Sequence, residues 1–318
     1  EMQRSLVGSE MCIRDRYTSS TDELIFKKRL FKERMQMEYI ILNNNIEIPQ
    51  LGLGTYLLKP DDAQAAVSSA LGMGYELIDT ANAYVNERAV GRGMRDSKLE
   101  RESVFLETKL WPCFYNSETA IDETLERLNT SYIDLMILHQ PAGDFLAGYA
   151  KLENAYKAGK LRSIGISNFN EEEIEHLLAH CEIVPSLIQV ECHPYYPQTH
   201  LKEMLTKHGI ALQAWYPLGG RGDGCIMDEP IVKQLAAKHG KTPAQIIMRW
   251  HIQQGNIVIP GSKTPSHIAE NIDIFDFELS DEDMAAMSTL DQGKPFYERT
   301  PEKMDMYATW HPDVEGQK

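Results

Sequence analysis

The chain has 318 residues, of which 42% are hydrophobic and 25% charged, a balance typical of globular proteins and not of disordered or collagen-like ones. No apolar run approaches the roughly 20 residues that a membrane-spanning helix requires, so we expect no membrane partner. The 47 acidic residues outnumber the 32 basic ones, and the net charge is −15. A nucleic-acid partner is not expected either, because no basic surplus is present to neutralise phosphates.

The first 36 residues differ from the rest of the chain. They hold no sustained helix or strand pattern before Glu23, and their run SLVGSEMCIRDR resembles translated sequencing-adapter read-through. We therefore expect residues 1–36 to be a non-native or disordered extension, with Met35 or Met37 as the true start. Residues 37–318 are then expected to form one domain.

Five cysteines are scattered along the chain without CxxC spacing. No apolar segment typical of a secretory signal is found near the N-terminus. We therefore expect reduced thiols and a cytoplasmic location.

From Tyr39 onwards, apolar runs of strand length alternate with amphipathic stretches of helix length. Residues 39–49 indicate a short β-hairpin, with Asn43 to Asn45 as its turn. The predicted strands that follow cover residues 50–55, 76–79, 104–108, 133–139, 163–167, 187–191, 211–215 and 257–260. The predicted helices between them cover residues 61–71, 86–96, 117–128, 145–158, 171–180, 199–207 and 243–254.

This alternation predicts the fold class. Each strand is apolar on both faces, which is typical of a parallel sheet with helices covering both sides. Eight strand–helix units in about 280 residues favour a single α/β domain, a closed (β/α)8 TIM barrel, over an open, doubly wound sheet of similar content. Active sites of such barrels lie at the carboxyl ends of the strands, so polar residues there are the candidates for function.

Three successive predicted strands end in the polar residues Asp79, Lys109 and His139. Tyr84 follows Asp79 by five residues, in a loop that can fold back over the barrel mouth. Each strand-end residue alone has a structural explanation, as a helix cap, a solvated strand end or a satisfied core histidine. Together they are candidates for catalysis, because a barrel brings its strand ends to one mouth.

Such a set supports acid catalysis by a phenol. Tyrosine has an ordinary pKa of about 10, and a nearby ammonium lowers it by favouring the phenolate. Lys109 can supply that charge, with Asp79 holding the ammonium in place. His139 can orient a carbonyl oxygen toward Tyr84, which protonates the alkoxide formed when hydride reaches the carbonyl carbon. This chemistry requires no metal.

These residues lie within segments that resemble the aldo-keto reductase family. GYELIDTANAYVNERAVG is similar to the family's first signature, LERLNTSYIDLMILHQP to its second and IVIPGSKTPSHIAENI to its third. The likeness runs from Ile40 to Leu290, and the family's catalytic tetrad falls on Asp79, Tyr84, Lys109 and His139. The resemblance implies NAD(P)H-dependent reduction of an aldehyde or ketone to an alcohol, by a barrel of a kind that is often monomeric.

The resemblance also implies where the cofactor binds. Ser167, Asn168 and Gln189 correspond to the residues that hold the nicotinamide carboxamide, and Trp215 corresponds to an aromatic ring that stacks on the nicotinamide. The other implied cofactor contacts are Gly54, Thr55, Asp79, Leu218, Ser262, Lys263, Thr264, His267 and Asn271. The last five lie at the final strand and the next helix start, where backbone amides can hold phosphate.

Two positions of the third signature depart from the family pattern. Gly261 stands where a lysine usually grips the 2′-phosphate of NADPH, and His267 stands where an arginine usually follows. Lys263 can take over the phosphate contact, although a neutral histidine is a weaker phosphate partner than arginine. We therefore expect NADP(H), with NAD(H) as the alternative.

The implied substrate pocket is lined by Tyr56, Trp111, Phe114 and His139. Gln140 and the short loop that follows it resemble bacterial diketogluconate and glyoxal reductases. This resemblance implies an open pocket for small polar dicarbonyls or aldehydes.

Two other functions stay open at this point. A metal-dependent barrel hydrolase would use Asp79 and histidines as ligands, and the lone His139 argues against it. A nucleotide-binding barrel of redox-sensing type would keep the cofactor residues and turn over slowly, which an intact tetrad does not exclude. The YxxxK pair of short-chain dehydrogenases is matched by Tyr156 and Lys160, but Gly159 indicates a helix end between them.

Overall fold

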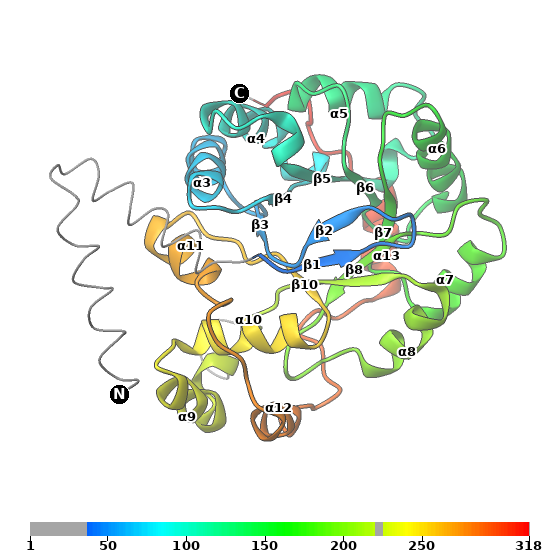
Figure 1. Cartoon of the computed structure of the whole chain (residues 1–318). Coiled ribbons are helices and arrows are strands. Elements are labelled where there is room, and N and C mark those ends of the chain that lie inside the picture. Colours follow the sequence, from blue (N-terminus) through cyan, green and yellow to red (C-terminus); the bar gives the residue numbers. More distant parts are fainter. Residues whose placement is uncertain (1–36, 220–224, 318) are drawn as a thin grey trace, which may run out of the picture. The chain divides into compact units, whose positions relative to one another are not determined.

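A sheet of eight parallel strands forms the centre of the computed structural model, which describes residues 37–219 and 225–317 (Figure 1). The strands pair in chain order from the first to the last. They are β3 (Gly52–Gly54), β4 (Leu77–Asp79), β5 (Phe105–Leu110), β6 (Leu135–Leu138), β7 (Ile164–Ser167), β8 (Leu187–Glu191), β9 (Ala211–Trp215) and β10 (Ile257–Val258). Each predicted strand is confirmed to within a few residues, and the prediction for residues 1–36 lies outside the described ranges.

Backbone contacts between the first and last strands close the sheet into a barrel. Val258 donates its N–H to the carbonyl oxygen of Gln50 at 2.8 Å, and Gly54 donates to Pro260 at 3.3 Å. A side chain at Gly54 would place its Cβ 2.6 Å from the carbonyl oxygen of Ile259, so glycine allows this close approach. The predicted (β/α)8 barrel is confirmed, because a doubly wound sheet would leave these edges apart.

Helices cover the outside of the barrel (Figure 1). They are α3 (Pro60–Gly72), α4 (Glu87–Asp96), α5 (Ala120–Leu128), α6 (Phe145–Lys157), α7 (Glu171–Leu178), α8 (Thr199–His208), α9 (Pro230–His239), α10 (Pro243–Gln253), α11 (Pro265–Ile272), α12 (Asp281–Ser288) and α13 (Pro301–Thr309). The seven predicted helices are present, α11 is the helix that the resemblance implied after the final strand, and α9, α12 and α13 were not predicted. Within the described ranges, no helix is long and apolar enough to cross a membrane.

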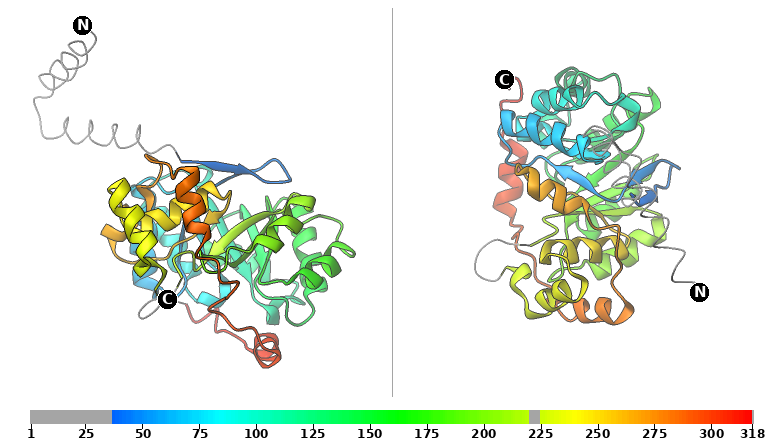
Figure 2. Two further views of the ribbon diagram at one scale, coloured as in Figure 1. Left: turned by 90° about the horizontal axis from the view of Figure 1, so that it is seen from below. Right: turned by 60° about the vertical axis from the view of Figure 1, so that its left-hand side comes forward.

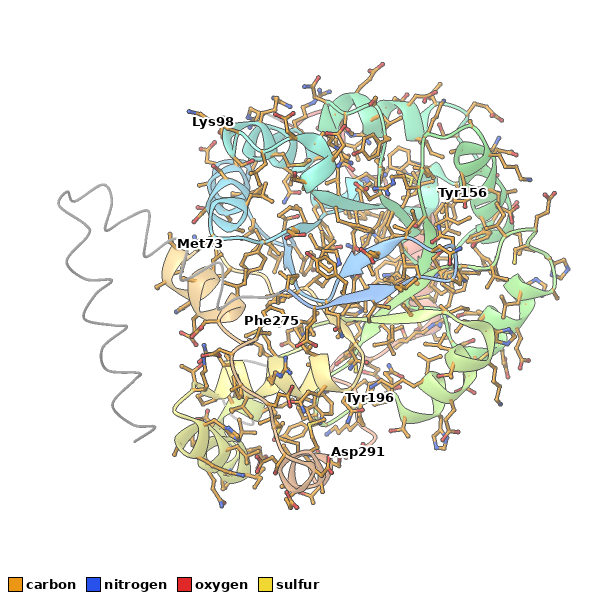
Figure 3. The ribbon with its side chains drawn as sticks, viewed as in Figure 1. Met73, Lys98, Tyr156, Tyr196, Phe275 and Asp291 are labelled. Atoms are coloured by element: carbon orange, nitrogen blue, oxygen red, sulfur yellow. The ribbon has the colours of Figure 1, made fainter. Side chains whose placement is uncertain are left out.

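Helix α6 ends where the sequence predicted. It stops at Lys157, and Gly159 follows with a φ of +75°. Tyr156 lies on this helix in the outer ring (Figure 3). Because Lys160 lies beyond the helix end, the two residues do not form the shared helix face that the short-chain dehydrogenase pair needs.

The N-terminal hairpin closes one end of the barrel. β1 (Tyr39–Ile41) and β2 (Glu47–Pro49) pair antiparallel around a turn in which Asn45 has a φ of +64°, as the asparagines predicted. Leu42 and Ile48 pack against the apolar residues at the starts of the strands, such as Leu77 and Leu135. Figure 2 shows the hairpin and α13 at opposite ends of the barrel, so the carboxyl ends of the strands lie on the α13 side.

Candidate active site

The four predicted catalytic residues lie together at the carboxyl ends of neighbouring strands. Asp79 ends β4 and Lys109 lies near the end of β5. His139 directly follows β6, and Tyr84 ends the short 3-10 helix η1 (Asn82–Tyr84). The ammonium of Lys109 forms an ion pair with Asp79 and donates to the carbonyl oxygen of Thr80 at 2.9 Å. Its Nζ lies 5.0 Å from the ring centre of Tyr84, which is 5.6 Å from that of His139.

A buried network fixes the end of β4. Thr55 donates its N–H at 3.0 Å and its hydroxyl at 2.9 Å to the carbonyl oxygen of Asp79. Asn86 accepts from the Thr80 hydroxyl and donates to the carbonyl oxygen of Thr55, both at 2.9 Å. Of the two predicted cofactor residues here, Thr55 is fully buried and supports Asp79, while Gly54 closes the barrel.

The phenol of Tyr84 is a weaker acid than a free tyrosine. Burial raises its pKa, the charge and hydrogen bonding of Lys109 lower it, and Asp79 raises it again, so that the net pKa is above the ordinary 10.0. The sequence predicted a lowered pKa, which is wrong for this structure because burial outweighs the ammonium. Burial lowers the pKa of Lys109. The negative charge of Asp79 and the nearby Tyr84 and Glu107 together raise this pKa by more, so the side chain stays charged.

The imidazole of His139 is neutral. Burial, and then the charge of Lys109, lower its pKa well below the ordinary range. Its Nδ1 is buried without a hydrogen-bond partner in the described part of the chain. The ring packs edge-on against Trp111, with ring centres 4.9 Å apart. A neutral imidazole has one N–H to donate, which suits it to orienting a carbonyl oxygen.

A second carboxyl group, that of Glu107, lies next to Asp79, and the sequence analysis missed it. Glu107 is fully buried on β5, and its Cα pairs in register with that of Asp79. Its Oε1 accepts from Gln189 at 3.0 Å and its Oε2 accepts from Gln213 at 2.9 Å. The available signal was a charged residue two positions before Lys109, on the same face of a strand expected to be buried.

Asn168 connects the residues predicted to hold the nicotinamide. It adopts a φ of +66°, and its side-chain amide donates to the Ser167 hydroxyl at 3.0 Å and to the carbonyl oxygen of His139 at 3.1 Å. Its side-chain oxygen accepts from the indole N–H of Trp215 at 2.8 Å. Gln189 differs from this group, because its amide nitrogen points to the Asp79 carboxylate at 3.1 Å.

The predicted phosphate contacts lie mostly at an exposed edge. Lys263, Thr264 and His267 are exposed where α11 begins, and the Ser262 hydroxyl accepts from the Thr264 N–H at 3.1 Å. Thr264 is the N-cap of α11 and its side chain makes no capping bond, while Pro265 at the first helical position has no N–H and the His267 N–H donates to the Thr264 carbonyl oxygen at 3.0 Å. The ammonium of Lys263 lies 3.3 Å from a carboxylate oxygen of Asp62.

Two further predicted cofactor residues have more enclosed surroundings. Leu218 follows β9 and packs against a hydrophobic cluster that includes Ile226 and Trp250. Asn271 is buried on α11. Leu218 thus lies in the segment after β9, and Asn271 lies on the helix after β10.

The C-terminal segment covers Trp111, and the sequence analysis did not assign this segment. The indole N–H of Trp111 donates to the carbonyl oxygen of Trp310 at 3.1 Å. Its ring meets those of Tyr307 and Trp310 edge-on, with ring centres 5.2 and 5.1 Å apart. The wall that carries Trp111 is therefore built from two segments about 200 residues apart.

The other predicted pocket residues lie nearer the surface. Tyr56 is 64% exposed, and its ring centre lies 5.1 Å from that of Tyr84. Phe114 ends the 3-10 helix η3 (Pro112–Phe114) and is partly buried. Tyr56 thus lies directly beside the phenol of Tyr84.

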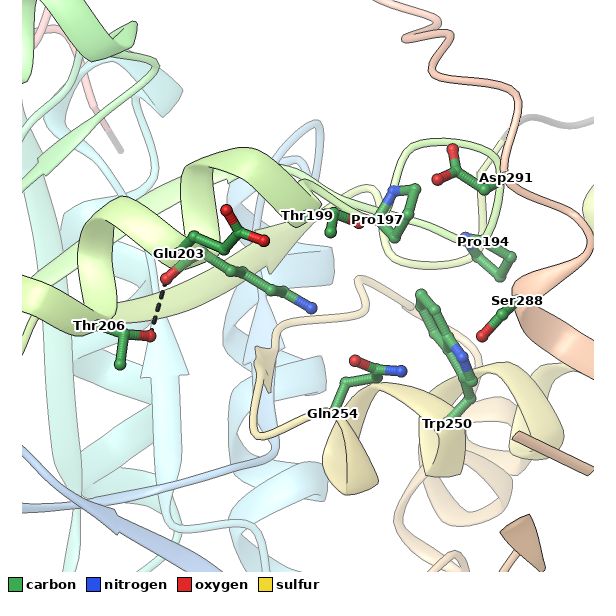
Figure 4. Close-up of a pocket in the computed structure, with 10 residues that line it drawn as sticks. Pro194, Pro197, Thr199, Glu203, Thr206, Trp250, Gln254, Ser288 and Asp291 are labelled. Carbon is green, nitrogen blue, oxygen red and sulfur yellow. Dashed lines mark hydrogen bonds between the residues drawn. The ribbon is translucent and has the colours of Figure 1, made fainter. Parts of the chain in front are cut away.

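A cavity of about 320 Å³ is found elsewhere, between α8, α10 and α12 (Figure 4). It is lined by Pro194, Pro197, Thr199, Lys202, Glu203, Thr206, Trp250, Gln254, Ser288 and Asp291. None of these residues belongs to the predicted site, so this cavity is separate from the four predicted catalytic residues.

Comparison with known proteins decides the family. The sequence model of the Aldo/keto reductase family matches residues 50–223 and 228–292. The chain belongs to this family. An aldo/keto reductase is an oxidoreductase that acts on carbonyl compounds, so the hydrolase and the binding-only barrel are not favoured.

Named relatives of this aldo/keto reductase include enzymes with different substrates. Glyoxal reductase of Bacillus subtilis is 41% identical over 79% of this chain and 92% of its own length. Morphine 6-dehydrogenase of Pseudomonas putida is 41% identical over 80% of this chain and 91% of its own. The crystal structure of an aldo/keto reductase from Brucella melitensis aligns with a TM-score of 0.78 at 41% identity, covering 81% of this chain and 99% of that one.

Proposed function

We propose that this aldo/keto reductase uses NAD(P)H to reduce small polar aldehydes and dicarbonyl compounds to alcohols, with Tyr84 as the proton donor. The observation that carries the proposal is the placement of the Tyr84 phenol between the buried Lys109–Asp79 pair and the neutral ring of His139. The group holds an acid, a cation beside it and a neutral hydrogen-bond donor at one barrel mouth.

Tyr84 acts as a general acid in this proposal. When bound, a reduced nicotinamide would supply a hydride to the carbonyl carbon, which would leave the electron pair of the broken π bond on the carbonyl oxygen. That oxygen takes the phenolic proton, which leaves a phenolate on Tyr84. The ammonium of Lys109, 5.0 Å from the ring centre, stabilises this phenolate by charge.

The high pKa of Tyr84 is compatible with this direction of reaction. Because its pKa lies above 10.0, the phenol is protonated at neutral pH and the proton is present when the alkoxide forms. An alkoxide is a much stronger base than a phenolate, so the transfer still runs toward the product. His139, being neutral, orients the carbonyl oxygen and does not compete as the acid.

The residues present fit a nicotinamide dinucleotide. The partly exposed Trp215 ring is held by Asn168 at the mouth, where it can stack on a nicotinamide. The start of α11, whose N-cap side chain makes no capping bond, lies next to the exposed ammonium of Lys263, and both suit phosphate. These are the residues that would hold the two ends of the cofactor.

NADPH is the preferred cofactor in this proposal, and Lys263 is the residue that distinguishes it from NADH. Lys263 is free to leave Asp62 for a 2′-phosphate, since their 3.3 Å pair is exposed and therefore weak. His267 is exposed at the same edge and adds little when neutral.

Polar atoms without partners favour a polar substrate. Among the described residues, the side-chain nitrogen of Asn82 and the side-chain oxygen of Gln140 are buried and unpaired, as is Nδ1 of His139. Asn82 also accepts from the backbone N–H of Trp111 at 3.1 Å, which fixes it beside the pocket wall. Burying unpaired polar atoms is costly: a second carbonyl oxygen on the substrate would accept from the Asn82 amide, and a substrate hydroxyl would donate to the Gln140 oxygen. The named glyoxal reductase relative fits this class. A monomeric state and a cytoplasmic location remain our predictions.

One assay tests the function. The purified chain is mixed with NADPH or NADH and with methylglyoxal, a diketogluconate or an aromatic aldehyde, and cofactor oxidation is followed by absorbance. We expect oxidation of NADPH, fastest with the dicarbonyl compounds. Oxidation of neither cofactor with any carbonyl would contradict the proposal.

A further inference from the structure

The barrel interior holds a second acid, Glu107, directly beneath the catalytic group. Glu107 lies two residues before Lys109 on β5, so both side chains point to the interior. Its Cα pairs in register with that of Asp79 on the neighbouring strand, and its side chain is fully buried. Two carboxyl groups therefore lie side by side below one ammonium.

The amides of two other strands hold this pair of carboxyl groups. The side-chain nitrogen of Gln189 on β8 lies 3.1 Å from Asp79 Oδ2 and 3.0 Å from Glu107 Oε1. The same nitrogen lies 2.6 Å from the side-chain oxygen of Gln213 on β9, whose own nitrogen donates to Glu107 Oε2 at 2.9 Å. These hydrogen bonds hold the two carboxyl groups next to each other, and the four residues that make them are all buried.

The charges of this cluster do not balance unless one carboxyl group is neutral. The titratable groups that face Glu107 are Asp79 on β4 and Lys109 on β5, with Tyr84 on η1 beyond the ammonium. β8 and β9 contribute uncharged amides. Two carboxylates with one ammonium would leave a net negative charge in the interior, which costs far more than keeping a proton.

The pKa of Glu107 also indicates that this carboxyl group is the neutral one. Burial raises its pKa well above the ordinary 4.5, and the charge of Asp79 and a hydrogen bond with Asp79 raise it further. Lys109 and the Gln213 amide lower it by less. A neutral Glu107 has an O–H to donate, and Asp79 is the adjacent acceptor.

We propose that Glu107 is a positioning residue of the reductase: it shares one proton with Asp79, and this pair, rather than Asp79 alone, fixes the ammonium of Lys109 beneath the ring of Tyr84. The inference deepens the proposed function and rests on it for its kinetic part. Glu107 holds the Asp79 carboxylate from behind and keeps the cluster of three groups neutral overall. With the two carboxyl groups held in this way, the ammonium of Lys109 stays close to the ring of Tyr84.

An infrared spectrum of the substrate-free and cofactor-free protein tests the shared proton. At pH 7 almost all carboxyl groups are ionised, so the carbonyl stretch of a neutral carboxylic acid identifies a buried proton. We expect this band in the wild-type protein and its loss in Glu107→Gln. The matched control is Glu153→Gln, which removes another buried carboxyl group, one on α6 that accepts the backbone N–H groups of Glu182 and Ile183. The control is expected to keep the band.

Kinetics test the positioning role. Glu107→Gln keeps a neutral donor beside Asp79 and is expected to retain kcat within about threefold, whereas Glu107→Leu removes the donor and is expected to lower kcat about ten- to hundredfold. The Kd of NADPH is expected to stay within about twofold in both variants, because the predicted cofactor residues that Glu107 contacts in the structure are Gln189 and Asp79, and neither is a predicted phosphate contact. Equal losses of kcat in the two variants would overturn the positioning role.

The outcomes separate this inference from the proposed function. Identical infrared spectra of wild-type protein and Glu107→Gln would overturn the shared proton, whatever the enzyme reduces. A band that is lost in Glu107→Gln, in a protein that oxidises no NADPH with any carbonyl, would support the proton and refute the function. Should Glu107→Leu fail to fold, the infrared comparison and the kcat of Glu107→Gln decide the matter.

Discussion

Two ion pairs of this barrel have the same chemistry and opposite surroundings. The side chains of Lys109 and Asp79 are 0% and 2% exposed, in the barrel interior. Those of Lys263 and Asp62 are 64% and 37% exposed, at the edge where α11 begins. Charges act strongly where water is excluded and weakly where it screens them. The interior pair therefore fixes the chemistry, while the edge pair can exchange its partner for a cofactor phosphate.

This difference indicates which of the two ion pairs tolerates amino-acid substitution. Replacing one interior group leaves another buried charge uncompensated, so the catalytic cluster tolerates little change. The edge differs from the family pattern at Gly261 and His267, and the exposed Lys263 is our proposed replacement there.

Lys109→Met is expected to destabilise the protein most. It leaves Asp79 and Glu107 buried without their cation, which should lower the free energy of unfolding by about 3–5 kcal/mol. Urea denaturation at pH 7 measures the loss. Lys263→Met is the matched control from the exposed pair and should change the unfolding free energy little. Similar losses in the two variants would contradict the contrast.

Glu107→Gln should alter how stability depends on pH. The folded-state pKa of Glu107 is raised, so its stabilising contribution is complete below about pH 4.5 and is lost as pH rises toward the folded pKa. Compared with the wild type, the variant should gain about 1.4 kcal/mol of unfolding free energy per pH unit above that point. Urea denaturation at pH 5, 6 and 7 measures the difference, and a constant difference would show that Glu107 is ionised.

Lys263→Ala should weaken NADPH binding about fivefold and leave NADH binding unchanged, because the proposal gives this exposed ammonium a contact with the 2′-phosphate, which NADH lacks. Fluorescence titration of Trp215 quenching measures both Kd values. Unchanged affinity for NADPH would remove Lys263 from the phosphate site.

Asp62→Asn should strengthen NADPH binding, and by a smaller factor than Lys263→Ala weakens it. Removing the carboxylate frees Lys263 and should tighten NADPH binding about twofold. The same titration measures it, with NADH as the internal control. Weaker NADPH binding would mean that Asp62 holds Lys263 in place for the cofactor.

The sequence predicted the elements that follow from strong local patterns. Two-sided apolar strands and Gly or Pro joints are local signals, and they located the barrel and the strand ends with Asp79, Lys109 and His139. The helices that were missed also carried signals: Ser280 and Asp283 form a capping box for α12, and Pro230 begins α9.

The remaining features depend on packing, which a single sequence does not reveal. The contact of Trp111 with Trp310 joins segments about 200 residues apart, and no local pattern predicts it. The rise in the pKa of Tyr84 comes from burial, whereas only its charged neighbour was visible in the sequence. Glu107 was overlooked because its importance comes from the register that places it beside Asp79.

The central claim is that Tyr84 delivers the proton within the buried cluster. The most direct measurement is kcat for methylglyoxal reduction by wild-type protein and Tyr84→Phe, with the Kd of NADPH determined for both. The account predicts that kcat falls about 10²- to 10⁴-fold while the Kd stays within about twofold, because only the transferable proton is removed. Wild-type kcat in Tyr84→Phe would contradict it.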